Sequence, residues 1–265
     1  MKRLILAAML ASGIAATPAY ADDALKAAIA SKDRTPANVT RDGARHPYET
    51  LQFFGIKPSM TVVELSPGGG WYTEILAPYL RDSGKLIMAA DSPTSDNENS
   101  RKSAERMTKK LEANPGMYGK VVRGQFEVPR AYNYAAPGTA DMVVTFRNLH
   151  NWAGAPGAMD AVLKSVHTAL KPGGVFGVVE HRANAGKPYD PKSGYMLEAD
   201  VIKTIEKAGF KLAAKSEVNA NPKDSADHNK GVWSLPPVLA NKDVDREKYV
   251  AIGESDRMTL KFVKQ

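Results

Sequence analysis

A short apolar run that leads through three consecutive glycines into a helical pattern limits the fold of this chain more than any other feature. The run covers residues 61–65, the glycines are Gly68, Gly69 and Gly70, and the helical pattern covers residues 71–80. In an open parallel sheet, ligands bind outside the carboxyl ends of the strands, where the first strand-to-helix turn often contacts them. Glycine lets the backbone approach a ligand closely because it has no side chain. The turn therefore predicts a ligand site at the end of the first strand.

The rest of the chain alternates between strand-like and helix-like patterns. The strand-like runs are rich in valine and lie at residues 61–65, 85–90, 120–123, 141–145, 175–180, 210–218 and 257–263. The helical patterns lie at about residues 45–55, 71–80, 98–112, 157–170 and 198–208. Such alternation predicts an α/β fold, with a parallel sheet covered by helices on both faces. We expect residues 22–265 to form one domain, with an ordered excursion at about residues 219–254.

The first 21 residues are typical of a secretory signal peptide. Lys2 and Arg3 precede an apolar run, and Ala19, Tyr20 and Ala21 form a small-x-small cleavage site. The apolar run is too short to span a bilayer. We therefore expect cleavage after Ala21, a periplasmic product and no stable membrane anchor.

Charge and composition narrow the classes of partner. The net charge of the chain is +7, but the cations are mostly interleaved with acids and two of them lie in the leader. Together with the predicted export, this interleaving of cations and acids argues against a nucleic-acid partner. The sequence has no cysteine, so it excludes disulfides and thiolate metal sites, and the chain must be stabilised by its core. The oligomeric state is left open.

Two classes of cofactor use a glycine turn of this kind. A dinucleotide site has the pattern G-x-G-x-x-G, in which the last glycine allows close packing of the helix. Here the last position is Thr73, a branched residue, which counts against NAD. Asp91 ends the second strand-like run, close to where a ribose-binding acid belongs, and it suits any cofactor that contains adenosine.

The motif resembles that of the class I methyltransferases that use S-adenosylmethionine (SAM). Their first motif is an acid at the end of strand one followed by alternating glycines, and Glu64, Ser66, Gly68 and Gly70 are similar, with serine in the first glycine place. Residues 91, 124–126, 145–150 and 170–176 resemble four further points of that family in the same order. The resemblance implies a Rossmann-like, seven-stranded, mainly parallel sheet and SAM as the cofactor. The cofactor contacts that it implies are Glu64, Ser66, Gly68, Gly69, Gly70, Trp71, Asp91, Gln125 and Phe126.

A closer resemblance is to a group of exported bacterial proteins that are predicted methyltransferases. It rests on residues 46–51, 67–76 and 254–263. This resemblance implies a fold and a class of cofactor, but it identifies no methyl acceptor.

The candidate acid–base residues follow two strands that such a fold places side by side. His150 and Asn148 follow the strand-like run at 141–145, and Glu180 and His181 end the run at 175–180. An imidazole accepts a proton near neutral pH, so His150 or His181 could act as a general base, with Asn148 as an orienting group. Each histidine taken alone is more often a structural hydrogen-bonding group. No histidine spacing is typical of a metal site, and we expect none.

Two functions remain open at this point. The first is a SAM-dependent methyltransferase that acts on a small molecule or a component of the cell envelope. The second is a non-catalytic periplasmic ligand-binding or structural protein on the same fold. The near-complete set of motifs favours the enzyme, and the compartment favours the binding protein, because SAM is made in the cytoplasm.

Overall fold

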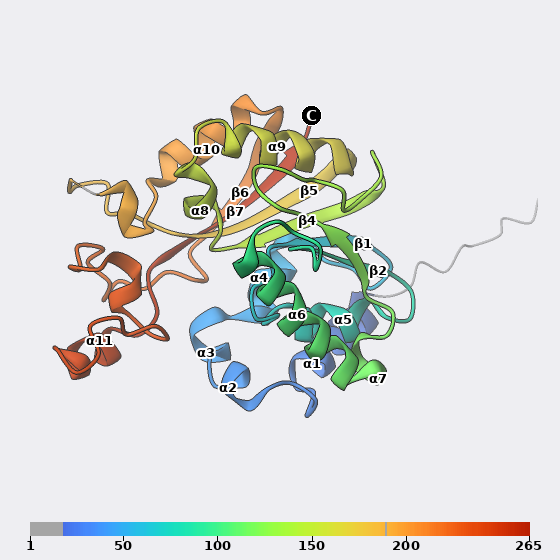
Figure 1. The fold of residues 1–265 in the computed structure, drawn as a ribbon, viewed down its shortest axis with the longest axis horizontal. Helices are drawn as coiled ribbons and strands as arrows, with labels where there is room; N and C mark the ends of the chain where they lie inside the picture. Colours follow the sequence, from blue (N-terminus) through green and yellow to red (C-terminus); the bar gives the residue numbers. More distant parts are fainter. Residues whose placement is uncertain (1–17, 189) are drawn as a thin grey trace, which may run out of the picture.

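The computed structural model describes residues 18–188 and 190–265, and Figure 1 shows their arrangement as one sheet between two layers of helices. Of the signal peptide predicted at residues 1–21, residues 1–17 lie outside the described part of the chain. Among the described residues, no helix has both the length and the apolar character needed to cross a bilayer.

The seven strands form one sheet in the order β3-β2-β1-β4-β5-β7-β6. All neighbouring pairs are parallel except those of β7, which runs antiparallel to β5 and β6. This arrangement confirms the predicted mainly parallel α/β sheet. The strands are β1 (Thr61–Leu65), β2 (Lys85–Ala90), β3 (Val122–Gln125), β4 (Ala140–Phe146), β5 (Leu170–His181), β6 (Phe210–Ser216) and β7 (Arg257–Lys264).

Helices cover both faces of the sheet because its strands are apolar on both sides. On one face, α8, α9 and α10 pack on the sheet, and on the other face α1, α4, α5 and α7 do so (Figure 1). The approach is close at Gly177 of β5, where an added Cβ would lie 2.8 Å from the ring of Phe54 in α4. The helices are α1 (Pro18–Ile29), α2 (Pro36–Val39), α3 (Asp42–Arg45), α4 (Pro47–Phe54), α5 (Thr73–Leu80), α6 (Glu98–Ala113), α7 (Pro115–Tyr118), α8 (Leu149–Ala153), α9 (Ala158–Ala169), α10 (Glu198–Lys207) and α11 (Arg246–Ile252).

Element boundaries differ from the sequence prediction at several places, of which three follow. Helix α5 begins at Thr73 rather than at residue 71, because the residues before it form a turn in which the amide of Gly70 donates to the carbonyl of Pro67. Strand β3 begins two residues later than predicted, because the amide of Val121 closes a turn onto the carbonyl of Tyr118. Strand β5 begins at Leu170, directly after α9.

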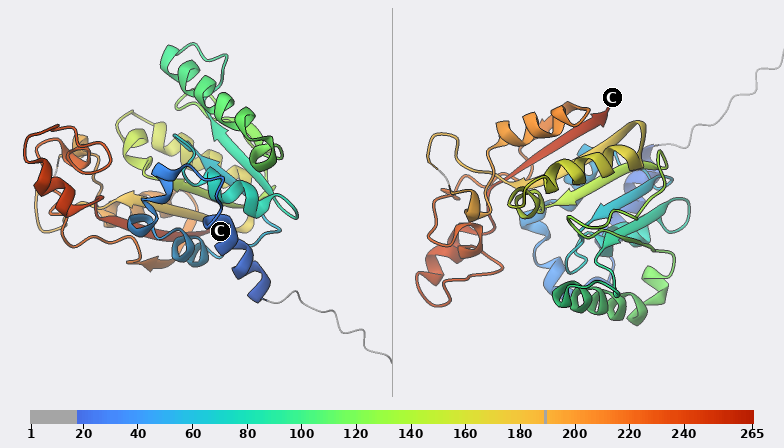
Figure 2. Two further views of the ribbon diagram at one scale, coloured as in Figure 1. Left: turned by 90° about the horizontal axis from the view of Figure 1, so that it is seen from below. Right: turned by 45° about the horizontal axis from the view of Figure 1, so that its top comes forward.

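The predicted excursion at about residues 219–254 is ordered and contains the short helix α11, which the sequence analysis did not predict. It lies beyond one end of the sheet, away from α6 (Figure 2). That end carries the carboxyl ends of the parallel strands, since the first residue of β7, Arg257, pairs there with His181, the last residue of β5. The excursion is therefore placed at the edge where this fold binds ligands.

Candidate functional site

The glycine turn after β1 contains three residues in the left-handed region. They are Ser66 with φ of 48°, Gly68 with φ of 59° and Gly70 with φ of 78°. Glycine adopts this conformation without cost, whereas serine does so with strain. A Cβ on Gly68 or on Gly69 would meet no atom within 4 Å, so the tip of the turn is open. Gly70 is buried instead, with its missing Cβ 3.2 Å from Lys110.

A cavity of about 150 Å³, called here the glycine-turn cavity, lies beside this turn. Its lining residues are Ser66, Pro67, Gly68, Ala90, Asp91, Ser103, Ala104, Met107, Arg123 and Asn148. A second cavity of about 270 Å³ shares Ala90, Asp91 and Arg123 with it and adds Gln125. Asp91 and Gln125, both implied cofactor contacts, therefore lie along one continuous region at the carboxyl ends of β1, β2 and β3.

The carboxylate of Asp91 accepts no hydrogen bond from the described part of the chain and is partly exposed. It is therefore available to accept hydrogen bonds from hydroxyl groups of a ligand. Phe126 differs from its expected role, because its side chain is buried in the core, 5.5 Å from the ring of Trp152. Its amide donates to the carbonyl of Ala90, which fixes the end of β3 against β2. Gln125 is thus the residue of this pair that lines a cavity.

Glu64 and Trp71 are placed away from the cavity, in contrast to the roles that the resemblance implies. Glu64 is 2% exposed and accepts a 2.7 Å hydrogen bond from the hydroxyl of Thr73 at the start of α5. Burial raises the pKa of Glu64 to about 7. The indole of Trp71 donates to the carbonyl of Asn38, and its ring lies under the guanidinium of Arg45. Both residues support the elements around the turn.

A cavity of about 300 Å³, called here the histidine cavity, lies on the other side of the segment that follows β4. Arg147 and His150 line it, whereas Asn148 lines the glycine-turn cavity. The side-chain amide of Asn148 donates from Nδ2 to the backbone carbonyls of Leu65 and Ser66, each at 3.3 Å. The residues that line the histidine cavity are Arg41, Arg45, Arg147, His150, Asn151, His181, Val232, Trp233, Pro236, Pro237, Val238, Glu254 and Ser255.

His150 and His181 lie side by side in this cavity, with ring centroids 5.3 Å apart. The Nδ1 atom of His150 is 2.9 Å from Oε1 of the buried Glu180, and the Nδ1 atom of His181 is 2.5 Å from the hydroxyl of Ser255. A carboxylate only accepts hydrogen bonds, so His150 carries its proton on Nδ1 and its Nε2 can accept another. Burial, and then repulsion by Arg147, lowers the pKa of His181 well below its usual value. His181 is therefore neutral at pH 7.

The structure also brings together three groups of the kind that bind metal ions, which sequence spacing did not show. Ligand atoms of His150, Glu180 and His181 lie within 4.8 Å of one another. Both oxygens of Glu180 already accept hydrogen bonds, however, from the amides of Leu149 and His181 and from the His150 ring. The adjoining arginines add repulsion for a cation. The arrangement suits an oriented histidine better than a metal centre.

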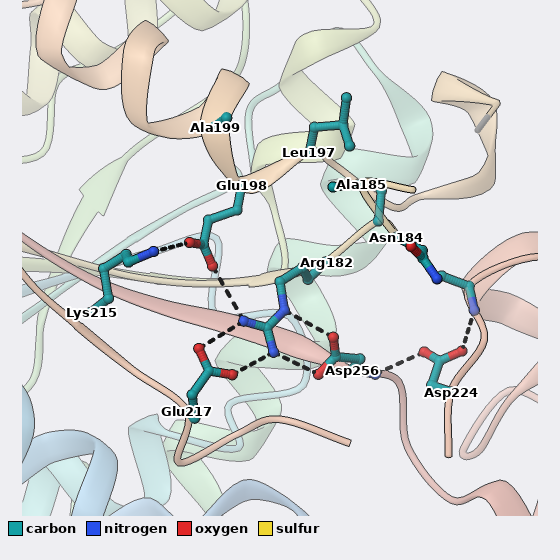
Figure 3. A pocket seen from close by; sticks show the side chains of 12 residues that line it. Arg182, Asn184, Ala185, Leu197, Glu198, Ala199, Lys215, Glu217, Asp224 and Asp256 are labelled. Carbon is teal, nitrogen blue, oxygen red and sulfur yellow. Dashed lines mark hydrogen bonds and ion pairs between the residues drawn. The ribbon is translucent and has the colours of Figure 1, made fainter. Parts of the chain in front are cut away.

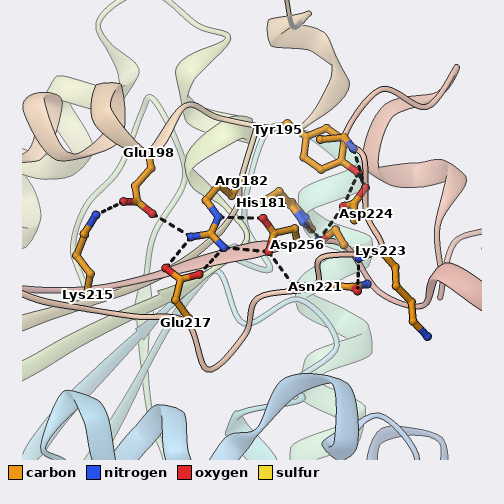
Figure 4. Close-up of polar contacts among 12 residues, drawn as sticks. His181, Arg182, Tyr195, Glu198, Lys215, Glu217, Asn221, Lys223, Asp224 and Asp256 are labelled. Atoms are coloured by element: carbon orange, nitrogen blue, oxygen red, sulfur yellow. Dashed lines mark hydrogen bonds and ion pairs between the residues drawn. The ribbon is translucent and has the colours of Figure 1, made fainter. Parts of the chain in front are cut away.

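A larger cavity, of about 680 Å³, lies beside Arg182 (Figure 3). None of its lining residues belongs to the glycine turn. Its charges compensate one another. Arg182 pairs with Asp256 at 2.9 Å, Glu217 at 2.6 Å and Glu198 at 3.3 Å, and Lys215 pairs with Glu198 at 2.6 Å. Figure 4 shows this network, which continues from Asp256 through Asn221. The network holds the start of β7, and thereby Glu254 and Ser255, against the end of β5.

Comparisons with known proteins agree with this fold. No family model matches the chain. An uncharacterized methyltransferase of Synechocystis sp. is 25% identical over 185 residues, which are 62% of this chain and 73% of that protein. A SAM-dependent methyltransferase from Aquifex aeolicus superposes with a TM-score of 0.55 at 17% identity, over 92% of this chain and 98% of that chain. The cyclase SpnF superposes with a TM-score of 0.56 at 14% identity, over 88% of this chain and 84% of its own. These likenesses show the fold, and function depends on the site.

Sequence reasoning missed the arginines of the histidine cavity. Arg147 lies within the segment 145–150 that was singled out, but Arg41 and Arg45 precede the sheet by many residues. Their shared partner, Glu254, lies more than 200 residues further along the chain. No local pattern connects positions so far apart.

Proposed function

We propose that this chain, which has the Rossmann-like fold of the SAM-dependent methyltransferases, transfers a methyl group from SAM to a small-molecule or cell-envelope acceptor. The observation that carries the proposal is the pairing of an open glycine turn with the unbonded carboxylate of Asp91 across one cavity. An adenosine cofactor requires both of these features, a backbone that it can approach and an acid for its ribose hydroxyls.

The residues of the two cavities have distinct roles in this proposal. SAM supplies an electrophilic methyl group when it is bound. Asp91 accepts hydrogen bonds from the ribose, Gly68 gives the ligand room, and Gln125 lines the adenine end. In the histidine cavity, Nε2 of His150 accepts a proton from an acceptor hydroxyl or amine, and Glu180 stabilises the resulting imidazolium. His181 is a second but weaker candidate base, because burial and the nearby Arg147 lower its pKa and so disfavour its protonation.

The alternative of a non-catalytic binding protein makes a different forecast for this region. It expects histidine side chains that hydrogen-bond to the backbone, and no open space beside the position of the sulfonium. Both histidines do have partners, yet both line a cavity of about 300 Å³. This open space next to an oriented imidazole supports the enzyme.

We further propose that the protein is exported and acts in the periplasm, as the group of exported predicted methyltransferases does. The leader pattern at residues 1–21 and the motifs at residues 46–51, 67–76 and 254–263 support this proposal. An exported enzyme would meet methyl acceptors that occur in the cell envelope.

Calorimetric titration of the purified protein with SAM and with its demethylated product tests the proposed function. We expect saturable binding of both ligands. Asp91→Ala should weaken SAM binding by roughly 10-fold, since it removes charge-assisted hydrogen bonds worth about 1.5–3 kcal/mol. Asp82→Ala is the matched control, because Asp82 is an exposed acid in the turn before β2. A parent protein that binds neither ligand, or equal SAM affinities in parent and Asp91→Ala, would contradict the proposal.

A further inference from the structure

Three arginines pair with a single carboxylate beside the histidine cavity, and a fourth arginine lines the cavity without pairing. Glu254 pairs with Arg41 at 2.7 Å, with Arg45 at 3.2 Å and with Arg257 at 2.9 Å. Arg147 lines the same cavity and makes no hydrogen bond or ion pair with its side chain in the described part of the chain. Although burial opposes it, the ion pairs with Arg45 and Arg257 lower the pKa of Glu254 to about 2. One negative charge therefore faces four positive charges.

Part of this excess positive charge is buried. Arg45 is 3% exposed, and its Nη1 atom is buried without a hydrogen-bond partner. Burial, and then repulsion by Arg147, lowers the pKa of Arg45 to about 8, and burial, and then repulsion by Arg257, lowers the pKa of Arg147 to about 10. A buried cation without a partner costs free energy, so such groups are normally paired. The arginines around the cavity would therefore stabilise an additional negative charge.

The backbone holds Arg147 in this position at a cost. Its φ is 62°, in the left-handed region that a non-glycine residue rarely adopts, and its amide donates a 2.7 Å hydrogen bond to the carbonyl of Val179. Strained residues of this kind are concentrated at functional sites. The neighbouring Asn148 lines the glycine-turn cavity, so these consecutive residues line the two different cavities.

The cavity beside Arg182 provides a contrast within the same molecule. There one arginine meets three carboxylates, and its cationic charge is fully compensated. An anion would gain little in that cavity and would be repelled by the acids. The histidine cavity has the opposite balance, which disfavours a metal cation and favours an anion.

We propose that the methyl acceptor is an anion, and that Arg147 and Arg45 bind its carboxylate or phosphate group in the histidine cavity. The inference rests on the proposed function, because it assigns the substrate class of the same site. Arginine suits this role because its planar group donates two parallel hydrogen bonds to either kind of oxyanion. His150 and His181 then lie beside the bound acceptor, and Asn148 lies on the side of the cofactor.

Titrations of the purified protein with inorganic phosphate and with acetate test the inference, at an ionic strength held constant with sodium chloride. We expect saturable binding of at least one of the two, and the preferred probe distinguishes a phosphate from a carboxylate acceptor. Arg147→Gln should weaken that binding by about 10-fold or more, because it removes charge-assisted hydrogen bonds. Arg81→Gln is the matched control, since Arg81 is an exposed arginine far from the cavity in sequence and paired with Asp82.

Thermal unfolding gives a second readout that a merely structural arginine would not produce. Without phosphate or acetate, Arg147→Gln should melt at a higher temperature than the parent, because it removes a partly buried cation that has no ion-pair partner and is repelled by Arg257. Addition of the preferred anion should raise the melting temperature of the parent and of Arg81→Gln, but not that of Arg147→Gln. Arg41→Gln should weaken anion binding to a smaller extent, because Arg41 already pairs with Glu254 at 2.7 Å.

Equal anion affinity in the parent and in Arg147→Gln, or no anion binding by the parent, would overturn the inference. Titration of the same variants with SAM separates this failure from failure of the proposed function. Arg147→Gln should bind SAM like the parent, because Arg147 does not line the glycine-turn cavity. A parent that binds the anion but not SAM would refute the methyltransferase while leaving the anion site in place.

Discussion

Glu64 shows how a single buried group affects stability over a defined range of pH. Its pKa is raised by burial to about 7 in the folded protein, against an ordinary value of 4.5. Between these two values the folded state retains a proton that the unfolded state has lost. The free energy of unfolding therefore falls as the pH rises from about 4.5 to about 7, and this contribution is constant at higher pH.

Glu64→Gln should remove this pH-dependent loss of stability, because the glutamine side chain has the same shape as the glutamate side chain and does not ionise. At pH 8 the variant should be more stable than the parent by about 1–3 kcal/mol, whereas at pH 5 the two should differ much less. Urea unfolding at the two pH values measures both differences. Glu105→Gln, on the exposed face of α6, is the control and should show no such dependence. A difference between parent and Glu64→Gln that is the same at both pH values would refute the assignment.

At the scale of elements, one buried side chain connects the excursion to the end of the sheet. The carboxylate of Asp224 accepts hydrogen bonds from the hydroxyl of Tyr195, from the ring of His228 at 2.8 Å and from the amide of Asp256 at 2.8 Å. These bonds join residues that lie before, within and after the excursion. The excursion in turn supplies Trp233, Pro236 and Pro237 to the histidine cavity.

Asp224→Ala should loosen the excursion while the sheet stays folded, because it leaves several buried donors without an acceptor. Each such donor costs about 1–3 kcal/mol. Hydrogen exchange followed by mass spectrometry should show faster exchange in peptides from residues 219–254. Asp227→Ala is the control, since Asp227 is half-exposed and pairs with Lys187 at the surface. If both variants exchange like the parent, Asp224 does not hold the excursion.

Local patterns predicted the elements better than the site. The strand-like runs and the glycine turn are visible in the sequence because burial on both faces demands continuous apolar residues. The placement of Asp91 and Gln125 follows from the order of the strands, and both line cavities. Trp71 could not be placed in this way, because a residue at the start of a helix can face either the ligand or the core. Its contact with Arg45 is tertiary and leaves no local signal.

At the scale of the whole molecule, the predicted cleavage point coincides with a structural anchor. The carboxylate of Asp22 accepts hydrogen bonds from Tyr48 and, at 2.9 Å, from Gln52, both in α4, and it pairs with Lys26 at 2.7 Å. Cleavage after Ala21 would leave all of these contacts intact. It would also leave in place the buried residues Leu25 and Ala28, which lie on the described part of α1 and belong to the core on this face of the sheet.

We therefore expect the mature protein to begin at Asp22 and to be found in the periplasmic fraction. Mass spectrometry of that fraction from the native host should give a chain that lacks the first 21 residues. Intact chains that begin at Met1 and occur in the cytosol would refute the export proposal. They would also remove the compartment argument against SAM.

The consecutive residues Arg147 and Asn148 line different cavities, and this has a consequence for how the two ligands affect each other. A ligand that shifts this dipeptide from one side changes the cavity on the other side. Thermodynamic linkage then requires reciprocity: whatever factor the first ligand applies to the affinity of the second, the second applies to the affinity of the first. We therefore expect SAM and the anion to change each other's affinity by one common factor, which titration of each ligand in the presence of the other would measure.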